Sequence, residues 1–123
     1  MKIAVLTPTR GRPLKLDDFI RSVLSKASDE NVVFTFNYVD SDDPRIVAYK
    51  QYEEKIRGIG NENIYGEPMS VSKSWNVLAE RAIFMGADIL IMGNDDMMYR
   101  TKDWDKRIVE EAAKFKDEIY CMW

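Results

Sequence analysis

Two adjacent carboxylates follow a short apolar run late in the chain. Asp95 and Asp96 come after the segment Ile89–Met92 and are preceded by Gly93 and Asn94. Carboxylate oxygens suit a hard divalent cation such as Mg²⁺ or Mn²⁺, which keeps several waters and bridges to phosphates. Such a cation would offset the charge of a departing diphosphate. The alternative is an ordinary acidic turn after a strand.

A second acidic segment, residues 40–43, places three carboxylates in four positions. One of them could accept hydrogen bonds from a base N–H or a ribose hydroxyl, and we assign this role to Asp40. Because Asp42 and Asp43 stand next to Pro44, they are natural residues for capping the start of a helix. Asp42 is kept as a binding candidate as well.

A basic turn follows the first apolar run, with Arg10 and Arg12 on either side of Gly11. Arginine pairs with phosphate through two hydrogen bonds and stacks on bases, so this turn could face a nucleotide. Farther along, Lys73 and Asn76 could also reach a phosphate or a loop backbone. A solvated basic turn, a solvated lysine and a helix-surface asparagine are the alternatives.

The composition narrows the chemistry. The 123 residues include no histidine and one cysteine, Cys121, so histidine-based catalysis, histidine zinc sites and an internal disulfide are excluded. With 18 basic and 21 acidic residues the net charge is −3, which argues against general nucleic-acid binding. No targeting or membrane-spanning segment is visible, and we expect a single cytoplasmic domain over residues 1–123. Homo-oligomerisation is left open.

The pattern of apolar residues predicts alternating strands and helices. Strands are expected over residues 2–7, 32–39, 63–65, 88–92 and 119–123. Helices are expected over about 13 residues from Pro13, over 45–57, over 70–85, and from a cap at Thr101 to Phe115. Trp75 and Trp104 fall on the apolar faces of their helices, so core packing is the favoured interpretation for both.

This order predicts an α/β fold with a mostly parallel sheet and helices on both faces. Ligands of such folds bind at the carboxyl ends of the strands. The polar and acidic groups of this chain stand at those ends, at residues 7–12, 40–43 and 94–96. Thr7, Pro8 and Thr9 therefore join the candidate binding residues.

These segments together resemble the GT-A-fold glycosyltransferases, particularly family 2-like enzymes of phage or bacterial type. Residues 8–13 (PTRGRP) are similar to the family's P-T-x-x-R start, and residues 39–44 (VDSDDP) to its second-strand aspartate segment. Residues 74–76 (SWN) resemble its helix with an asparagine, and residues 89–96 (ILIMGNDD) stand where the family has its DxD motif. The resemblance covers essentially the whole chain.

The resemblance implies a Rossmann-like fold that binds a nucleoside-diphosphate sugar with Mn²⁺ or Mg²⁺ and transfers the sugar to an unknown acceptor. Thr9 and Arg10 would lie near the nucleoside, and Asp40 would contact the base or ribose. Asp96 would be the main metal ligand, with Asp95 near the ribose or the metal. Asn94 replaces the usual first aspartate, which removes one negative charge.

The chain stops earlier than the family does. Only 27 residues follow Asp96, whereas family members continue into a region that supplies the acceptor site and, in inverting enzymes, a general base. Asp103 and Asp105 are the nearest candidate bases, and Asp103 also suits the first turn of a helix. A natural minimal form of the enzyme, a fragment of a longer one and a donor-binding protein without transfer activity are all open. The alternative function is a non-catalytic nucleotide-sugar-binding or assembly module that retains only the donor half of the fold.

Overall fold

The computed structural model describes residues 1–56, 60–114 and 121–122. Its strands are β1 (Lys2–Thr9), β2 (Val32–Asp40), β3 (Asn61–Gly66), β4 (Ile89–Met92) and β5 (Cys121–Met122). Its helices are α1 (Pro13–Lys26), α2 (Ile46–Lys55), α3 (Val71–Phe84) and α4 (Trp104–Ala112). Strands and helices alternate along the chain, as the sequence predicts, and none of these described helices is long and apolar enough to cross a membrane.

The strands form one sheet in the order β3-β2-β1-β4-β5, and every neighbouring pair is parallel. The chain moves outward from β1 through β2 to β3 and then crosses to β4 on the other side of β1. In open parallel sheets the ligand crevice lies outside the carboxyl ends of the strands at such a reversal. The topology therefore points to the carboxyl ends of β1 and β4, and it is compatible with a Rossmann-like fold.

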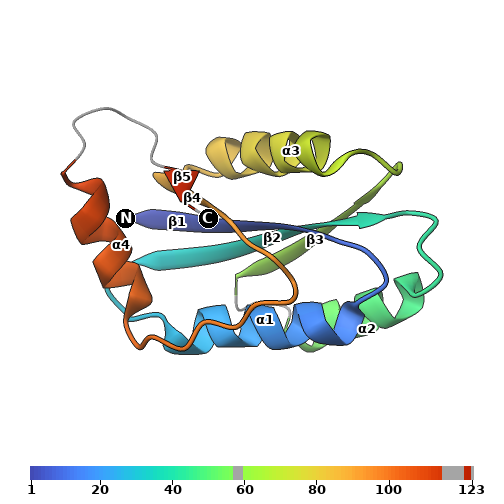
Figure 1. Cartoon of the computed structure of the whole chain (residues 1–123), viewed down its shortest axis with the longest axis horizontal. Helices are drawn as coiled ribbons and strands as arrows, with labels where there is room; N and C mark the ends of the chain where they lie inside the picture. The colour runs from blue at the N-terminus through green and yellow to red at the C-terminus, as the bar shows by residue number, and fades with distance from the viewer. Residues whose placement is uncertain (57–59, 115–120, 123) are drawn as a thin grey trace.

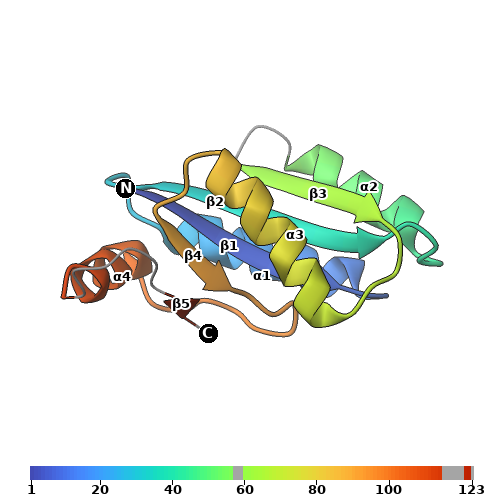
Figure 2. The same cartoon turned by 90° about the horizontal axis from the view of Figure 1, so that it is seen from above.

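Helices cover both faces of the sheet, which confirms the predicted layers (Figures 1 and 2). Side chains of β1 alternate between the faces: Ile3 and Val5 pack with α1 and α4, whereas Ala4 and Leu6 pack with α3. Trp104 of α4 is buried in the first cluster, and its indole N–H donates to the carbonyl oxygen of Val23 at 2.9 Å. The core interpretation of Trp104 is confirmed.

Strand β1 continues through Pro8 to Thr9, two residues beyond the predicted end. The carbonyls of Lys2 and Leu6 point toward β4, so the nitrogen of Pro8, two residues beyond Leu6, lies on the same side. Strand β4 pairs with β1 only as far as Leu6. Proline therefore removes no ladder hydrogen bond here, and pairing with β2 continues to Thr9.

The predicted cap at Thr101 is wrong. Helix α4 begins at Trp104 after Asp103, whose φ of 58° is left-handed and whose side chain makes no capping hydrogen bond. The backbone N–H of Asp103 donates to the carbonyl of Lys26 at 2.7 Å, so contacts with the end of α1 fix where α4 starts. Phe115 and residues 119, 120 and 123 of the last predicted helix and strand lie outside the described residues.

Candidate functional site

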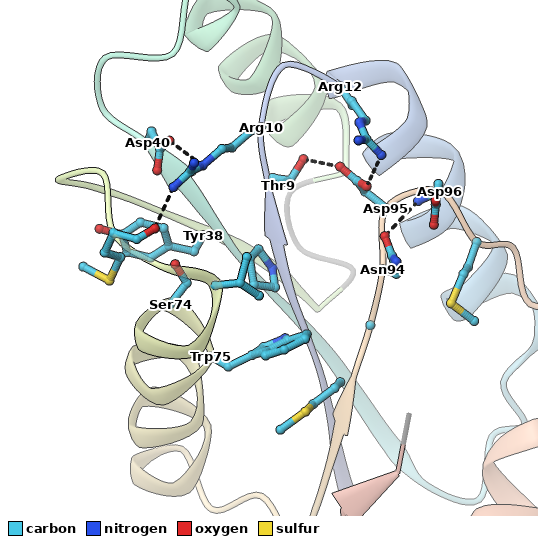
Figure 3. Close-up of a pocket in the computed structure, with 16 residues that line it drawn as sticks. Thr9, Arg10, Arg12, Tyr38, Asp40, Ser74, Trp75, Asn94, Asp95 and Asp96 are labelled. Atoms are coloured by element: carbon cyan, nitrogen blue, oxygen red, sulfur yellow. Dashed lines mark hydrogen bonds and ion pairs between the residues drawn. The ribbon is translucent and has the colours of Figure 1, made fainter.

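A cleft of about 800 Å³ opens at the carboxyl ends of β1, β2 and β4, on the side of the sheet that α3 covers (Figure 3). Its walls come from the turn after β1, the end of β2, the first turns of α3 and the segment after β4. The lining residues are Pro8, Thr9, Arg10, Arg12, Tyr38, Asp40, Met69, Val71, Ser74, Trp75, Met92, Gly93, Asn94, Asp95, Asp96 and Met97. The structure thus brings together the three predicted polar segments.

The cleft has an apolar wall beside its charged groups. Trp75 of α3 is partly buried against the core and also lines the cleft, beside Tyr38 and Met92. Its indole N–H donates to the carbonyl oxygen of Leu6 at 3.3 Å, which fixes the ring against the end of β1. A flat ring or the apolar face of a sugar could pack here while charged groups of the ligand meet the other wall.

Arg10 bridges two walls of the cleft. Its Nε lies 2.9 Å from Oδ2 of Asp40, and its Nη2 donates to the carbonyl oxygen of Met69 at 2.6 Å (Figure 3). The Asp40 side chain is only 12% exposed, whereas that of Arg10 is 60% exposed. The carboxylate is therefore held in place, and the guanidinium is accessible to solvent and could meet a ligand.

Asp95 is 5% exposed and has a protein partner on each carboxylate oxygen. Thr9 Oγ1 donates to Oδ2 at 2.7 Å, and Arg12 Nη1 donates to Oδ1 at 3.3 Å (Figure 3). These contacts join the end of β1 and the start of α1 to the segment after β4. The two contacts fix the orientation of the Asp95 carboxylate.

Asp96 differs from Asp95 because it is exposed. Its backbone N–H donates to Oδ1 of Asn94 at 3.4 Å, and the N–H of Met97 donates to the carbonyl oxygen of Asn94 at 3.1 Å. This turn leaves the Asp96 carboxylate at the edge of the cleft, beside the buried Asp95.

Asp96 is the cleft residue that could hold a divalent cation, if a bound phosphate shared that cation. Among the residues whose side chains are described, no group of three or more acidic, cysteine or histidine side chains forms a ready-made cage. None of the described residues pairs with the Asp96 carboxylate, which could supply an oxygen ligand, while both oxygens of Asp95 already have partners. Mg²⁺ is usually held by one or two carboxylates together with substrate phosphates, and this donor set matches that pattern.

Two residues support the cleft from outside its lining: Tyr49, which sequence reasoning missed, and Asp43, which was expected only to cap a helix. Tyr49 of α2 is 1% exposed, and its phenol accepts from the N–H of Arg12 at 2.9 Å and lies 2.8 Å from Thr9 Oγ1. Asp43 accepts from the N–H of Gly11 at 2.8 Å. The position of Asp43 before a predicted helix could have indicated that its carboxylate binds backbone N–H groups. Tyr49 lies in a helix of mostly charged residues, and nothing in that segment indicates a contact with the cleft.

Asp43 also accepts from the N–H of Arg45 at 2.8 Å, in the turn before α2. The predicted helix cap at Asp42 or Asp43 is wrong, because α2 begins at Ile46 after Arg45 and no side chain of the described residues caps it. Asp42 is exposed and does not line the cleft. Lys73 and Asn76 are likewise exposed on α3 outside the cleft lining. Of the residues near the start of α3, Ser74 and Trp75 line the cleft instead.

Thr7 is fully buried and lies below the cleft rather than in its lining. A Cβ atom on Gly93 would come within 2.5 Å of Thr7 Oγ1 and within 3.0 Å of the Phe19 ring. Gly93 therefore lets the segment after β4 pass close over Thr7 and Phe19, which sets the path of the acidic turn.

The two candidate bases lie outside the cleft. Asp105 is fully buried and accepts hydrogen bonds from the N–H and hydroxyl of Ser28 at 2.7 and 2.5 Å, and from Asn31 at 2.8 Å. Burial acts to raise its pKa, but the hydrogen bonds from Ser28 and Asn31 outweigh burial and hold the pKa below its usual value. Asp103 is the last residue before α4. Neither acid therefore lies where it could act as a base in the cleft.

In chemical terms the cleft offers a buried, oriented carboxylate at Asp40 and two exposed guanidinium groups. It also offers an acidic turn that can share a cation and a tryptophan wall. This combination suits a ligand with a flat ring, hydroxyl groups and a phosphate chain. Searches of protein-family models and of curated proteins found no match to this chain.

Proposed function

We propose that this chain binds a nucleoside-diphosphate sugar with Mg²⁺ or Mn²⁺ and transfers the sugar to an acceptor hydroxyl, as a GT-A-like glycosyltransferase. The observation that carries the proposal is that Asp40 and the segment Asn94–Asp96, far apart in sequence, line one cleft. That cleft lies at the strand reversal where parallel α/β folds bind nucleotides. The resemblance of four ordered sequence segments to the GT-A family supports the same function.

The cleft residues suggest how the donor would lie. Asp40 is held by Arg10 and would accept hydrogen bonds from the base or the ribose. Trp75 and Tyr38 would pack against the flat part of the nucleoside or the sugar. Arg12, half-exposed beside Asp95, would face the diphosphate.

Asp96 would hold the cation together with the diphosphate oxygens. When bound, a divalent cation neutralises the charge that develops on the leaving diphosphate. Asp95 would keep the turn in place through Thr9 and Arg12, so that the Asp96 carboxylate stays at the edge of the cleft.

Transfer also needs a group that takes the proton of the acceptor hydroxyl. The acceptor oxygen bonds to the anomeric carbon while the bond from that carbon to the diphosphate oxygen breaks, and the hydroxyl proton passes to a base. Among the lining residues the carboxylates are Asp40, Asp95 and Asp96, and the first two are already paired. Because Asp103 and Asp105 lie elsewhere, a non-catalytic donor-binding module is the second candidate function.

Calorimetric titration tests donor binding. UDP-, GDP-, TDP- and CDP-sugars would each be titrated into the protein with and without Mn²⁺. We expect one donor class to bind with an affinity that Mn²⁺ strengthens, and we expect Asp96→Ala to lose that strengthening. Asp29→Ala is the matched control, because Asp29 is an exposed acid outside the cleft lining.

Two further results separate the possibilities. Slow release of the free nucleoside diphosphate from the bound donor would support the transferase over the binding module, because water can replace the acceptor. If the folded protein gives no heat with any of the four donor classes, the proposed function is wrong.

A further inference from the structure

A continuous chain of hydrogen bonds runs from the backbone of Arg12 through helix α2 to the acidic turn. The N–H of Arg12 donates to the Tyr49 phenol at 2.9 Å, and that phenol lies 2.8 Å from Thr9 Oγ1. Thr9 Oγ1 in turn lies 2.7 Å from Oδ2 of Asp95. Tyr49, Thr9 and Asp95 are each at least 95% buried, so water does not compete for these contacts.

The chemistry of the groups fixes the direction of this chain. An ionised carboxylate only accepts hydrogen bonds, so the single hydroxyl proton of Thr9 must be directed at Asp95. Thr9 can then only accept from Tyr49, and the phenol proton must point at Thr9. The phenol oxygen accepts from Arg12, so each hydroxyl donates once and accepts once. Hydrogen bonds arranged head to tail in this way polarise and strengthen one another.

Ionisation would break the chain at Tyr49, and burial opposes it. Burial raises the pKa of the Tyr49 phenol above its usual value of 10, although the hydrogen bonds with Thr9 and Arg12 lower it in part. The phenol therefore keeps its proton at neutral pH and remains a donor to Thr9.

We propose that Tyr49 is a positioning residue for the acidic turn: through Thr9 it orients the Asp95 carboxylate, which holds Asp96 and Arg12 in place for the phosphate and cation of the ligand. This inference rests on the proposed function for its ligand. Tyr49 touches neither the cleft nor its ligand, because it is absent from the lining. It acts only through Thr9 and Arg12.

Tyr49→Phe tests the proposal because it removes the hydroxyl and keeps the ring. The ring packs in a cluster with Leu16, Ile20, Val39 and Ile56, which the phenylalanine ring still fills. Tyr65→Phe is the matched control: Tyr65 packs against the same cluster, but its hydroxyl bonds to Glu53 and Asn63, away from the cleft.

The first readout needs no ligand. Backbone amide resonances of Thr9, Asp95 and Asp96 should shift in Tyr49→Phe and stay unchanged in Tyr65→Phe. The second readout is the Mn²⁺ concentration that half-saturates donor binding at a fixed donor concentration. It should rise by about tenfold in Tyr49→Phe, equivalent to about 1.4 kcal/mol, and stay constant in Tyr65→Phe.

A second pair of variants covers the case in which Tyr49→Phe fails to fold. Thr9→Val removes the hydroxyl that links Tyr49 to Asp95 and keeps the side-chain shape, whereas Thr9→Ser keeps the hydroxyl. Thr9→Val should reproduce the resonance shifts and the weaker Mn²⁺ response, and Thr9→Ser should restore most of both.

The outcomes are separable from those of the proposed function. If no donor binds to the wild-type protein, the proposed function fails, and the amide resonances still decide whether Tyr49 positions the turn. The positioning role is overturned if folded Tyr49→Phe or Thr9→Val leaves the resonances of Asp95 and Asp96 unchanged. It is equally overturned if donor binding responds to Mn²⁺ as in the wild type.

Discussion

At the scale of single residues, the three carboxylates of the cleft differ in burial and in whether an arginine contacts them. Asp40 and Asp95 are buried and each contacts an arginine, whereas Asp96 is exposed. A buried carboxylate keeps a fixed orientation, and an exposed one can exchange water for a cation or a phosphate partner. We therefore expect Asp40 to recognise the ligand, Asp95 to position the acidic turn and Asp96 to share the cation.

Replacing Asp40 should weaken donor binding and barely change stability. Asp40→Ala removes an oriented acceptor from the cleft, and we expect donor affinity to fall by about tenfold, or about 1.4 kcal/mol. The ion pair that is lost has a well-exposed arginine partner, so the free energy of unfolding should change by less than about 1 kcal/mol. Calorimetric titration and chemical denaturation measure the two effects.

Asp42→Ala is the control for this substitution. Asp42 lies in the same acidic segment but is exposed and outside the cleft lining, so its removal should leave donor affinity unchanged. Equal loss of affinity in both variants would contradict the separate placement of these two aspartates.

Asp105 should matter for stability and not for donor binding. Asp105→Asn puts an amide N–H₂ among the donor groups of Ser28 and Asn31, and we expect a loss of about 1–3 kcal/mol in the free energy of unfolding. The melting temperature should fall by roughly 5–15 °C. Thermal denaturation measures the loss, and Asp103→Asn, whose side chain caps nothing, should melt close to the wild type.

The pH dependence of this loss has a definite sign. Because the folded pKa of Asp105 lies below its usual value of 3.8, its charge stabilises the fold fully at pH values above 3.8. That contribution disappears as the pH falls through the lower folded pKa. The difference between wild type and Asp105→Asn should thus be largest above pH 4 and shrink in more acidic solution; a difference that grows there would contradict the assigned hydrogen bonds.

At the scale of elements, the order of strands and helices could be predicted because apolar periodicity is local information. The predicted ends of elements were wrong where contacts with other elements determine where a strand ends or a helix begins. Pro8 is tolerated in β1 only because β4 stops short of it, and α4 starts at Trp104 because Asp103 and Trp104 bond to the end of α1. The residues that flank Pro8 do not show where β4 stops, and those that flank Thr101 do not show the contact with α1.

Helix α2 shows the same limit. Its charges suggest a solvated face with local ion pairs, yet Glu53 accepts from the N–H of Asn63 at 2.7 Å and from the hydroxyl of Tyr65 at 3.0 Å. Lys50 lies over the ring of Tyr65, 5.3 Å from its centre. The helix therefore supports β3 and, through Tyr49, the cleft.

The close passage of Gly93 over Thr7 is an element-scale contact that can be tested. Gly93→Ala would force the start of the acidic turn away from Thr7 and Phe19, and we expect a loss of about 1–3 kcal/mol in stability. Because the turn moves, donor binding should weaken as well. Chemical denaturation and calorimetric titration measure the two losses.

Thr7→Ala makes room for the added methyl group. In the double variant Thr7→Ala/Gly93→Ala, part of the Gly93→Ala loss should be recovered, since the two sites are in contact. Strictly additive losses in the two single variants and the double variant would show that this contact does not set the path of the turn.

At the scale of the whole molecule, the cleft follows from topology. Parallel strands bring their carboxyl ends to one edge, so the convergence of residues 7–12, 40–43 and 94–96 could be predicted before the strand order was known. The strand order and the pairing of charged side chains could not be predicted, because both depend on contacts between distant segments. Tyr49 illustrates this: it becomes part of the site only when α2 packs against the end of β1.

We propose above all that one cleft holds a nucleoside diphosphate together with a divalent cation. A crystal structure of the protein with UDP and Mn²⁺ tests it most directly, because the anomalous signal of Mn²⁺ locates the cation independently of the nucleotide. We expect Mn²⁺ beside the Asp96 carboxylate, with the diphosphate on the cation and the nucleoside between Asp40 and Trp75. A nucleotide bound outside this cleft, or a cation away from Asp96 with the nucleotide present, would contradict it.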